Sequence, residues 1–148
     1  MNRARLHYFK GRGRAETTRW MLAINKIDFI NITLEDHNDF DILKTSGKLP
    51  INQLPLLEID NIKLSQSSAM ISYLARRGDL YGRTDEETVR CEMLTGAVGD
   101  FNIPAIQFAF KALKDLETSL KKFGKHFEFA LSQNEGEFLV EKKQVWLI

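Results

Sequence analysis

The sequence predicts an α/β domain with the element order βαβαββα, followed by a shorter domain built only of helices. Two observations indicate this division. Up to Gly82, short segments in which apolar residues alternate are interleaved with segments in which they recur every three or four residues. After Gly82 only the helical spacing occurs over the next several turns. We therefore place a domain boundary there, which gives domains at 1–82 and 83–148.

The first elements form a βαβ unit. Residues 6–9 predict a strand, and the glycines of segment 11–13 allow the tight turn that follows. A helix is expected over 15–25, where Trp20 and Ala23 widen an apolar face that must be buried. The next segment, Phe-Ile-Asn-Ile-Thr-Leu, alternates with period two and predicts a second strand.

A short helix, a hairpin and a further helix complete the first domain. The short helix is predicted to have Asn38 as its N-cap and to end near Gly47. Strands at 56–59 and 62–65 are joined by Asp-Asn, a pair that tolerates a tight turn. The last helix is expected over 68–77, with the following glycine as its cap.

Two long helices are expected in the second domain. Thr84 and Glu87 have the spacing of a capping box that opens the first helix, and Pro104 is expected to end or kink it. The second is predicted from Ile106 to Leu131.

Composition excludes several classes of function. The 148 residues are 43% apolar and 28% charged, which is typical of a globular protein, and a net charge of +1 argues against a nucleic acid as partner. No apolar run approaches the roughly 18 residues of a membrane span, and no secretory signal opens the chain. We expect a cytoplasmic protein. A transit peptide is the alternative for the arginine-rich start, and the strand pattern there argues against it.

The lone Cys91 forms no internal disulfide and belongs to no group of cysteines that could bind zinc, so we expect no metal. Cys91 falls in a helix of the second domain, where we expect its side chain to be buried and to pack in the core.

The element order, with Pro55 before the hairpin, is that of a thioredoxin-like domain, although the usual dithiol is absent. Three segments resemble the cytosolic glutathione S-transferases, above all the alpha class: LHYFKGRGRAETTRW, QLPLLEID and LSQSSAMISYLARRGDLYG. They cover most of residues 5–82. The resemblance implies that glutathione binds this domain as co-substrate, and that the helical domain completes a site for a hydrophobic electrophile.

The resemblance assigns the activation of the thiol to Tyr8 and Arg14. A thiol with a pKa near 8.5 is only a few per cent ionised at pH 7, and the thiolate is the attacking species. A hydrogen bond from a phenol to that anion is worth roughly 1.5–3 kcal/mol, which lowers the thiol pKa by about one to two units. Arg14 would add positive potential. Without the resemblance, the two residues read as a core tyrosine and a surface charge.

The resemblance also assigns residues that hold the peptide. Gln66 and Ser67 stand at a helix N-terminus, which favours the γ-glutamyl carboxylate, and we expect Ser67 to cap that helix as well. Leu54 would pair through its backbone with the cysteinyl unit, before a cis Pro55. Gln53 adds an amide at the same rim.

Two further assignments concern charged residues. Lys44 would meet the glycine carboxylate. Asp100 would reach the γ-glutamyl amine of a neighbouring subunit, which implies a homodimer. For both residues the alternative is a solvated side chain on a helix.

The end of the chain departs from the family pattern. Helix is expected to be lost between Phe101 and Leu116, and Glu141 stands where relatives have a glycine before an aspartate box. We therefore expect a truncated second domain, from a shortened isoform or an incorrect gene model. Trp146 and Ile148 would form an exposed apolar patch.

These residues predict a glutathione transferase that conjugates the glutathione thiolate to hydrophobic electrophiles, with reduced turnover because the second domain is short. A non-catalytic glutathione-binding or structural member of the superfamily, such as a lens crystallin, is the alternative. A thiol oxidoreductase is disfavoured, because no cysteine lies near the start of the first helix.

Overall fold

The computed structural model describes residues 3–107 and 113–133. The chain divides into two compact units, which we call unit 1 (Met1–Gly78) and unit 2 (Asp79–Ile148). The structure thus divides the chain after Gly78, whereas the predicted boundary lies after Gly82. The turn segment between these two glycines belongs to unit 2.

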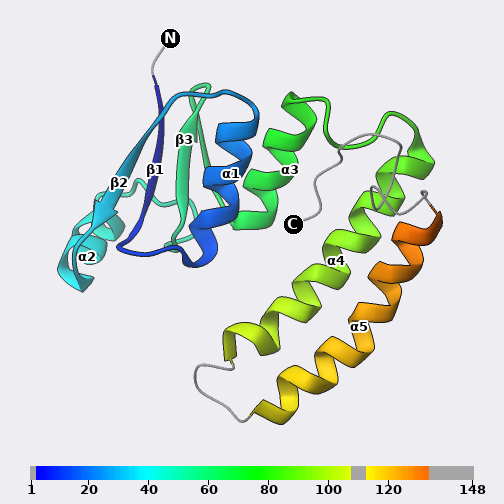
Figure 1. Ribbon diagram of the computed structural model, residues 1–148. Coiled ribbons are helices and arrows are strands. Elements are labelled where there is room, and N and C mark those ends of the chain that lie inside the picture. Colours follow the sequence, from blue (N-terminus) through cyan, green and yellow to red (C-terminus); the bar gives the residue numbers. More distant parts are fainter. Residues whose placement is uncertain (1–2, 108–112, 134–148) are drawn as a thin grey trace. The chain divides into compact units, whose positions relative to one another are not determined.

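Unit 1 contains a four-stranded sheet in the order β2-β1-β3-β4 (Figure 1). Its strands are β1 (Ala4–Phe9), β2 (Phe29–Leu34), β3 (Leu56–Ile59) and β4 (Ile62–Ser65). β1 pairs with β2 in parallel, and the other two pairings are antiparallel. The hairpin turn has Asp60 at φ 49° and Asn61 at φ 65°, so both residues adopt the left-handed conformation that such a turn requires. The predicted β2 and hairpin are confirmed.

Two helices, α1 (Glu16–Ile24) and α3 (Ser67–Arg77), lie side by side against the sheet (Figure 1). The fully buried side chains between these elements are mostly apolar; among them are Leu6, Met21, Leu22, Leu57, Met70 and Leu74. Thr18 of α1 is also fully buried, and its hydroxyl donates to Met70 Sδ at 3.6 Å. The core therefore ties together segments that are far apart in the sequence, which fixes the end of β1 against the starts of both helices.

The start and outer face of α1 differ from the prediction. A 3₁₀ turn (η1, Gly13–Ala15) precedes the helix, which begins at Glu16. Trp20 is 57% exposed and Ala23 is exposed as well, so the expectation that they widen the buried face is wrong. The indole N–H of Trp20 donates to Glu16 Oε1 at 3.2 Å, which holds the ring along the helix surface.

The helix α2 (His37–Thr45) has Asp36 as its N-cap, so the prediction of Asn38 is wrong. Asp36 has an extended backbone, and its carboxylate accepts the N–H of Asp39 at 3.0 Å. The carboxylate of Asp39 in turn accepts the N–H of Glu35 at 2.9 Å. The first bond satisfies a donor that the helix itself leaves free, and the second ties Asp39 to the residue before the N-cap. Together they set the start two residues earlier than Asn38 would.

Unit 2 contains a pair of contacting helices, α4 (Asp85–Gln107) and α5 (Leu113–Gln133). The capping box is confirmed, because the Thr84 N–H donates to Glu87 Oε2 at 3.1 Å and the Glu87 N–H donates to Thr84 Oγ1 at 3.2 Å. Pro104 does not end α4, because the helix continues past it to Gln107. The predicted start of the second helix, Ile106, is wrong, because this residue belongs to α4; α5 is described from Leu113.

The buried contact between these helices involves Cys91 and Leu94 of α4, each 4% exposed, with Phe127 and Ala130 packed against them. The expected burial of Cys91 is confirmed. Val89 and Met93, on another side of the same helix, are more than 60% exposed. The apolar end of the chain, with Trp146 and Ile148, lies outside the described residues, as does Glu141.

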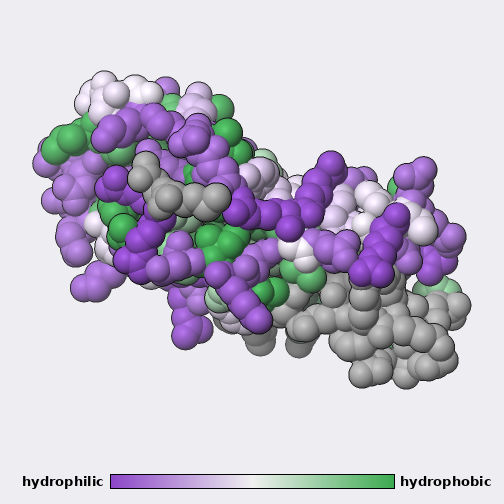
Figure 2. All heavy atoms as spheres, turned by 90° about the horizontal axis from the view of Figure 1, so that it is seen from above, coloured by the Kyte–Doolittle hydropathy of each residue, from purple (hydrophilic) through white to green (hydrophobic). Residues whose placement is uncertain are grey.

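Hydrophilic residues dominate the described surface in the view of Figure 2, where hydrophobic residues form separate patches. None of the helices in the described residues combines the length and the apolar character needed to cross a membrane. Over the same residues, no three His, Cys, Asp or Glu side chains gather as a metal site would require.

Candidate active site

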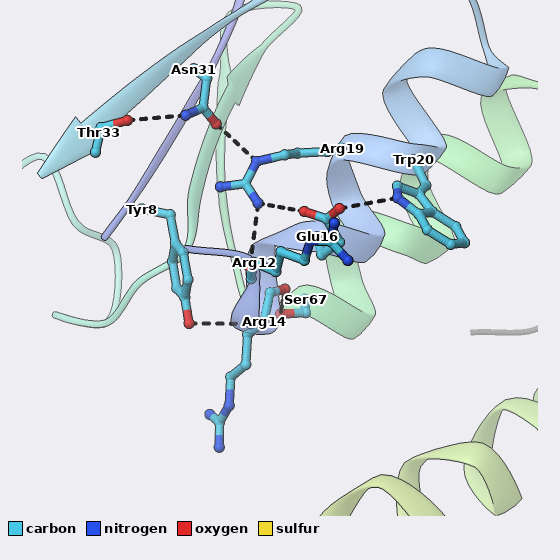
Figure 3. A network of polar contacts seen from close by, with 9 residues as sticks. All are labelled: Tyr8, Arg12, Arg14, Glu16, Arg19, Trp20, Asn31, Thr33 and Ser67. Carbon is cyan, nitrogen blue, oxygen red and sulfur yellow. Dashed lines mark hydrogen bonds and ion pairs between the residues drawn. The ribbon is translucent and has the colours of Figure 1, made fainter. Parts of the chain in front are cut away.

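Tyr8 lies at the end of β1, and its side chain is half-buried. The phenolic oxygen accepts a hydrogen bond from the backbone N–H of Arg14, with a distance of 3.1 Å between nitrogen and oxygen (Figure 3). A phenol has one O–H donor and can also accept. Because this contact uses the oxygen as an acceptor, the phenolic proton remains available for another group.

Gly13 makes this contact possible. Its φ is +42°, and a Cβ at this position would lie 2.6 Å from the Tyr8 hydroxyl oxygen. A side chain here would therefore collide with the phenol and would also strain the backbone. The sequence indicates a turn at this glycine, but it does not show that the turn packs closely against the Tyr8 side chain.

Arg14 joins the site through its main chain. Its N–H contacts Tyr8, and its carbonyl oxygen accepts the hydroxyl of Ser67 at 2.9 Å. The guanidinium is exposed and points away from the phenol in Figure 3. The polar contacts thus run from β1 through η1 to the first residue of α3.

Ser67 does not cap α3, so that expectation is wrong. The N-cap is Gln66, at φ 72°, and it makes no capping hydrogen bond through its side chain. The Ser67 hydroxyl instead donates a hydrogen bond to the Arg14 carbonyl oxygen. The first helical bond runs from the Met70 N–H to the Gln66 carbonyl at 3.1 Å, which leaves the N–H groups of residues 67–69 without an acceptor inside the helix.

The loop before β3 meets the same helix start. The peptide bond between Leu54 and Pro55 is cis, as the resemblance implied. Pro55 is buried, Leu54 is half-buried and Gln53 is exposed. The amide of Gln66 donates to Gln53 Oε1 at 3.0 Å, which links the proline loop to the N-terminus of α3.

The two charged residues predicted to hold the peptide lie elsewhere. Lys44 is exposed in the last turn of α2, and none of the described contacts joins it to Tyr8, Arg14 or Ser67. Asp100 is exposed on α4, in unit 2. Their assigned roles stay predictions.

Arg19 is a residue that the sequence analysis did not single out. From α1 it contacts Glu16, the carbonyl of Arg12, and Asn31 in β2 (Figure 3). The hydrogen bond from Arg19 is the main cause that holds the pKa of Glu16 below its usual value, with a smaller contribution from Trp20. The spacing of Glu16 and Arg19 was a usable signal for the ion pair. No signal in the sequence indicates the contact between Arg19 and Asn31, because this contact depends on the tertiary packing of α1 near β2.

A cavity of about 500 Å³ lies near the opposite end of β1 and the tip of the hairpin; its lining includes Arg3, Arg5, Glu58, Asp60 and Lys63. Two of its cations are paired, because Arg3 contacts Asp28 and Arg5 Nε lies 3.8 Å from Glu58 Oε2. Its lining includes neither Tyr8 nor Arg14 nor Ser67, so this cavity is separate from the group around Tyr8.

Unit 1 is thus a thioredoxin-like domain in which a tyrosine, rather than a dithiol, stands at the end of the first strand. The family model described as the glutathione S-transferase N-terminal domain matches residues 4–76. Glutathione S-transferase alpha-4 of Rattus norvegicus is 35% identical, over 96% of this chain and 68% of its own length. Glutathione S-transferase A3 of Mus musculus is 34% identical, over 91% of this chain and 65% of its own. The chain belongs to the glutathione S-transferase family.

Solved structures agree with this assignment. A glutathione S-transferase from Ascaris lumbricoides matches with a TM-score of 0.84 and 28% identity, over 99% of this chain and 76% of its own. A monomeric glutathione S-transferase from Necator americanus matches with a TM-score of 0.80 and 27% identity, over 97% of this chain and 75% of its own. The chain spans about two thirds of the length of the curated relatives it matches.

Proposed function

We propose that this protein binds glutathione and holds its sulfur as a thiolate, which then attacks a hydrophobic electrophile. The observation that carries the proposal is the state of the Tyr8 hydroxyl. Its oxygen accepts the Arg14 N–H, so its own proton is left to donate to an anion. Accepting one hydrogen bond polarises the phenol and strengthens the bond that it donates.

In the proposed reaction the thiol first loses its proton to solvent, and Tyr8 stabilises the resulting thiolate. The sulfur then forms a bond to the electrophilic carbon, and that carbon either loses a leaving group or passes an electron pair to an adjacent activated atom. Holding both reactants removes the entropy cost of their encounter. Arg14 contributes its backbone N–H to Tyr8. Its guanidinium, which is exposed and points away from the phenol, would have to turn toward the bound sulfur to add positive potential there.

The elements around Tyr8 offer groups for the rest of the tripeptide. The unpaired N–H groups at the start of α3, with Gln66 and Ser67, suit the γ-glutamyl carboxylate. The backbone of Leu54, before the cis Pro55, would pair with the cysteinyl unit. The bond between Gln66 and Gln53 holds these two segments together.

Lys44 is proposed to meet the glycine carboxylate, and Asp100 to reach the glutathione of a second copy. The second role requires a homodimer. Because the similar protein from Necator americanus is monomeric, the oligomeric state needs its own measurement. Size-exclusion chromatography with light scattering supports the proposed role of Asp100 if the mass is twice 17.1 kDa, and a monomer would contradict it. We further propose a cytoplasmic location, with no nucleic acid and no membrane as partner.

The decisive variant is Tyr8→Phe, with Tyr73→Phe as its matched control. Tyr73 also carries a bonded hydroxyl, which donates to Asp60 at 2.5 Å and lies at the hairpin. We expect Tyr8→Phe to raise the pKa of bound glutathione by about one to two units. Tyr73→Phe should leave it unchanged. The measurement is the ultraviolet absorbance of the thiolate as a function of pH.

Turnover provides the second test. We expect conjugation of a chlorodinitrobenzene-type electrophile to exceed the uncatalysed rate, and to fall about tenfold or more in Tyr8→Phe. Glutathione bound without any turnover above the uncatalysed rate would contradict the transferase activity. An unchanged thiol pKa in Tyr8→Phe would contradict the role of the tyrosine.

A further inference from the structure

Arg19 connects three segments of unit 1 through one guanidinium. Its Nε donates to Asn31 Oδ1 at 3.0 Å, and its Nη1 donates to Glu16 Oε2 at 2.7 Å and to the Arg12 carbonyl at 3.3 Å. The side chain is 20% exposed. Figure 3 shows the guanidinium between β2 and the glycine turn. Because a guanidinium is planar and rigid, it fixes its acceptors relative to one another.

The groups that hold Arg19 are themselves held. The amide of Asn31 donates to Thr33 Oγ1 at 3.2 Å, which orients the oxygen that faces Arg19. Glu16 accepts the indole N–H of Trp20 with its other oxygen. The lowered pKa of Glu16 keeps its carboxylate charged at neutral pH, so the ion pair is present under ordinary conditions.

The Arg12 carbonyl lies in the peptide unit just before Gly13, and the Arg14 N–H lies in the next one. Gly13, at φ +42°, is the point where the backbone could otherwise reorient, because glycine has few steric limits. Arg19 fixes the peptide before this glycine, and the Ser67 hydroxyl fixes the Arg14 carbonyl after it. The Arg14 N–H, which donates to Tyr8, therefore lies between two backbone carbonyls that are each held by a hydrogen bond.

We propose that Arg19 is a positioning residue that aims the Arg14 N–H at the Tyr8 hydroxyl, by holding the Arg12 carbonyl against α1 and β2. It touches neither glutathione nor the electrophile in this role. The inference rests on the proposed function, because its consequence is the strength with which Tyr8 stabilises the thiolate.

Arg19→Lys tests the proposal, since lysine keeps the charge but cannot reach several acceptors with a fixed plane. We expect the pKa of bound glutathione to rise by about half a unit to one unit, because a displaced hydroxyl loses part of its bond to the thiolate. Arg3→Lys is the matched control, because Arg3 donates to Asp28 with two nitrogens and lies outside the site. The thiol pKa should not change in that variant.

Combining Arg19→Lys with Tyr8→Phe separates positioning from a general structural role. If Arg19 acts through the hydroxyl, the double variant has the same thiol pKa as Tyr8→Phe alone. Circular dichroism and thermal melting report whether each variant folds. If Arg19→Lys does not fold, Asn31→Ala removes one support of the guanidinium, and the thiol pKa should rise by a smaller amount.

The proposal is overturned if a folded Arg19→Lys or Asn31→Ala variant keeps the wild-type thiol pKa while Tyr8→Phe shifts it. It is also overturned if Arg19→Lys shifts the pKa equally with and without the Tyr8 hydroxyl. Failure of the proposed function has a different result, which is an unchanged thiol pKa in Tyr8→Phe itself.

Discussion

The two units are stabilised in different ways. The most completely buried large side chains of the described residues all lie in unit 1, and they come from β1, α1, α3 and the segment from Pro55 through β3. Among the residues of unit 2 whose side chains are described, which exclude 102–119, the buried ones are Cys91, Leu94 and Phe123, at 4%, 4% and 9% exposed. Phe129 of α5 is 66% exposed. The Tyr8 hydroxyl keeps its direction only if the residues around it stay in place. The well-packed core of unit 1 holds those residues in place.

The largest expected effect of a substitution is on the core of unit 1. Leu74→Ala empties a fully buried position in α3, and we expect it to lower the free energy of unfolding by about 2–5 kcal/mol. Leu94→Ala in α4 should cost less, because Cys91 is the one other buried residue in its cluster among the side chains that the structure describes. Urea denaturation of both variants measures the difference. An equal loss in the two variants would contradict the contrast between the units.

The second effect compares two glycines. Gly13→Ala places a Cβ 2.6 Å from the Tyr8 hydroxyl, whereas Gly96 is exposed in α4 with nothing within 4 Å of its Cβ position. We expect Gly13→Ala to lower kcat/KM between about tenfold and a hundredfold, as small misplacements of reacting groups do. Gly96→Ala should instead stabilise the helix by about 1 kcal/mol and leave kcat/KM unchanged. Wild-type kinetics in Gly13→Ala would refute the close packing of this turn.

The third effect concerns the caps that open helices. Thr84→Ala removes one bond of the capping box of α4, and Asp36→Ala removes the N-cap of α2. Each should lower the free energy of unfolding by about 1 kcal/mol. Thr84→Ala should also reduce the hydrogen-exchange protection of the first turn of α4. Unchanged protection there would show that packing, rather than the cap, sets the start of the helix.

The smallest effect is on pH dependence. The pKa of Glu16 is lowered in the folded protein, first by its hydrogen bond from Arg19, so the ionised form favours folding. This contribution is complete above the unfolded pKa, near 4.5, and is lost as the pH falls through the lower folded value. Glu16→Gln should therefore show a shallower loss of stability below about pH 4.5. An identical acid limb in thermal melts of both proteins would contradict this assignment.

Local signals in the sequence predicted several elements well. The hairpin followed from Asp60 and Asn61, and the start of α4 from Thr84 and Glu87, because each depends on residues close together in the chain. The N-cap of α2 was mispredicted because both Asp36 and Asn38 can cap, and the choice depends on where the chain leaves β2. Trp20 was assigned to the buried face, since apolar spacing does not show that its indole N–H donates to Glu16.

The candidate site was predictable in part. The resemblance identified Tyr8, Arg14 and Ser67, which the structure brings together. It did not show that Arg14 contacts the phenol through its N–H, because that depends on the direction of the backbone after Gly13. The role of Arg19 depends on tertiary contacts between α1, the glycine turn and β2, which no local pattern reports.

The most direct test of the central claim is the titration of the thiol of glutathione bound to the wild-type protein. The ordinary pKa of a thiol is near 8.5, and a phenolic hydroxyl that donates to the sulfur should lower it by about one to two units. A bound thiol that titrates at least one unit below free glutathione agrees with a Tyr8 proton directed at the sulfur. A bound thiol that titrates like free glutathione would contradict it.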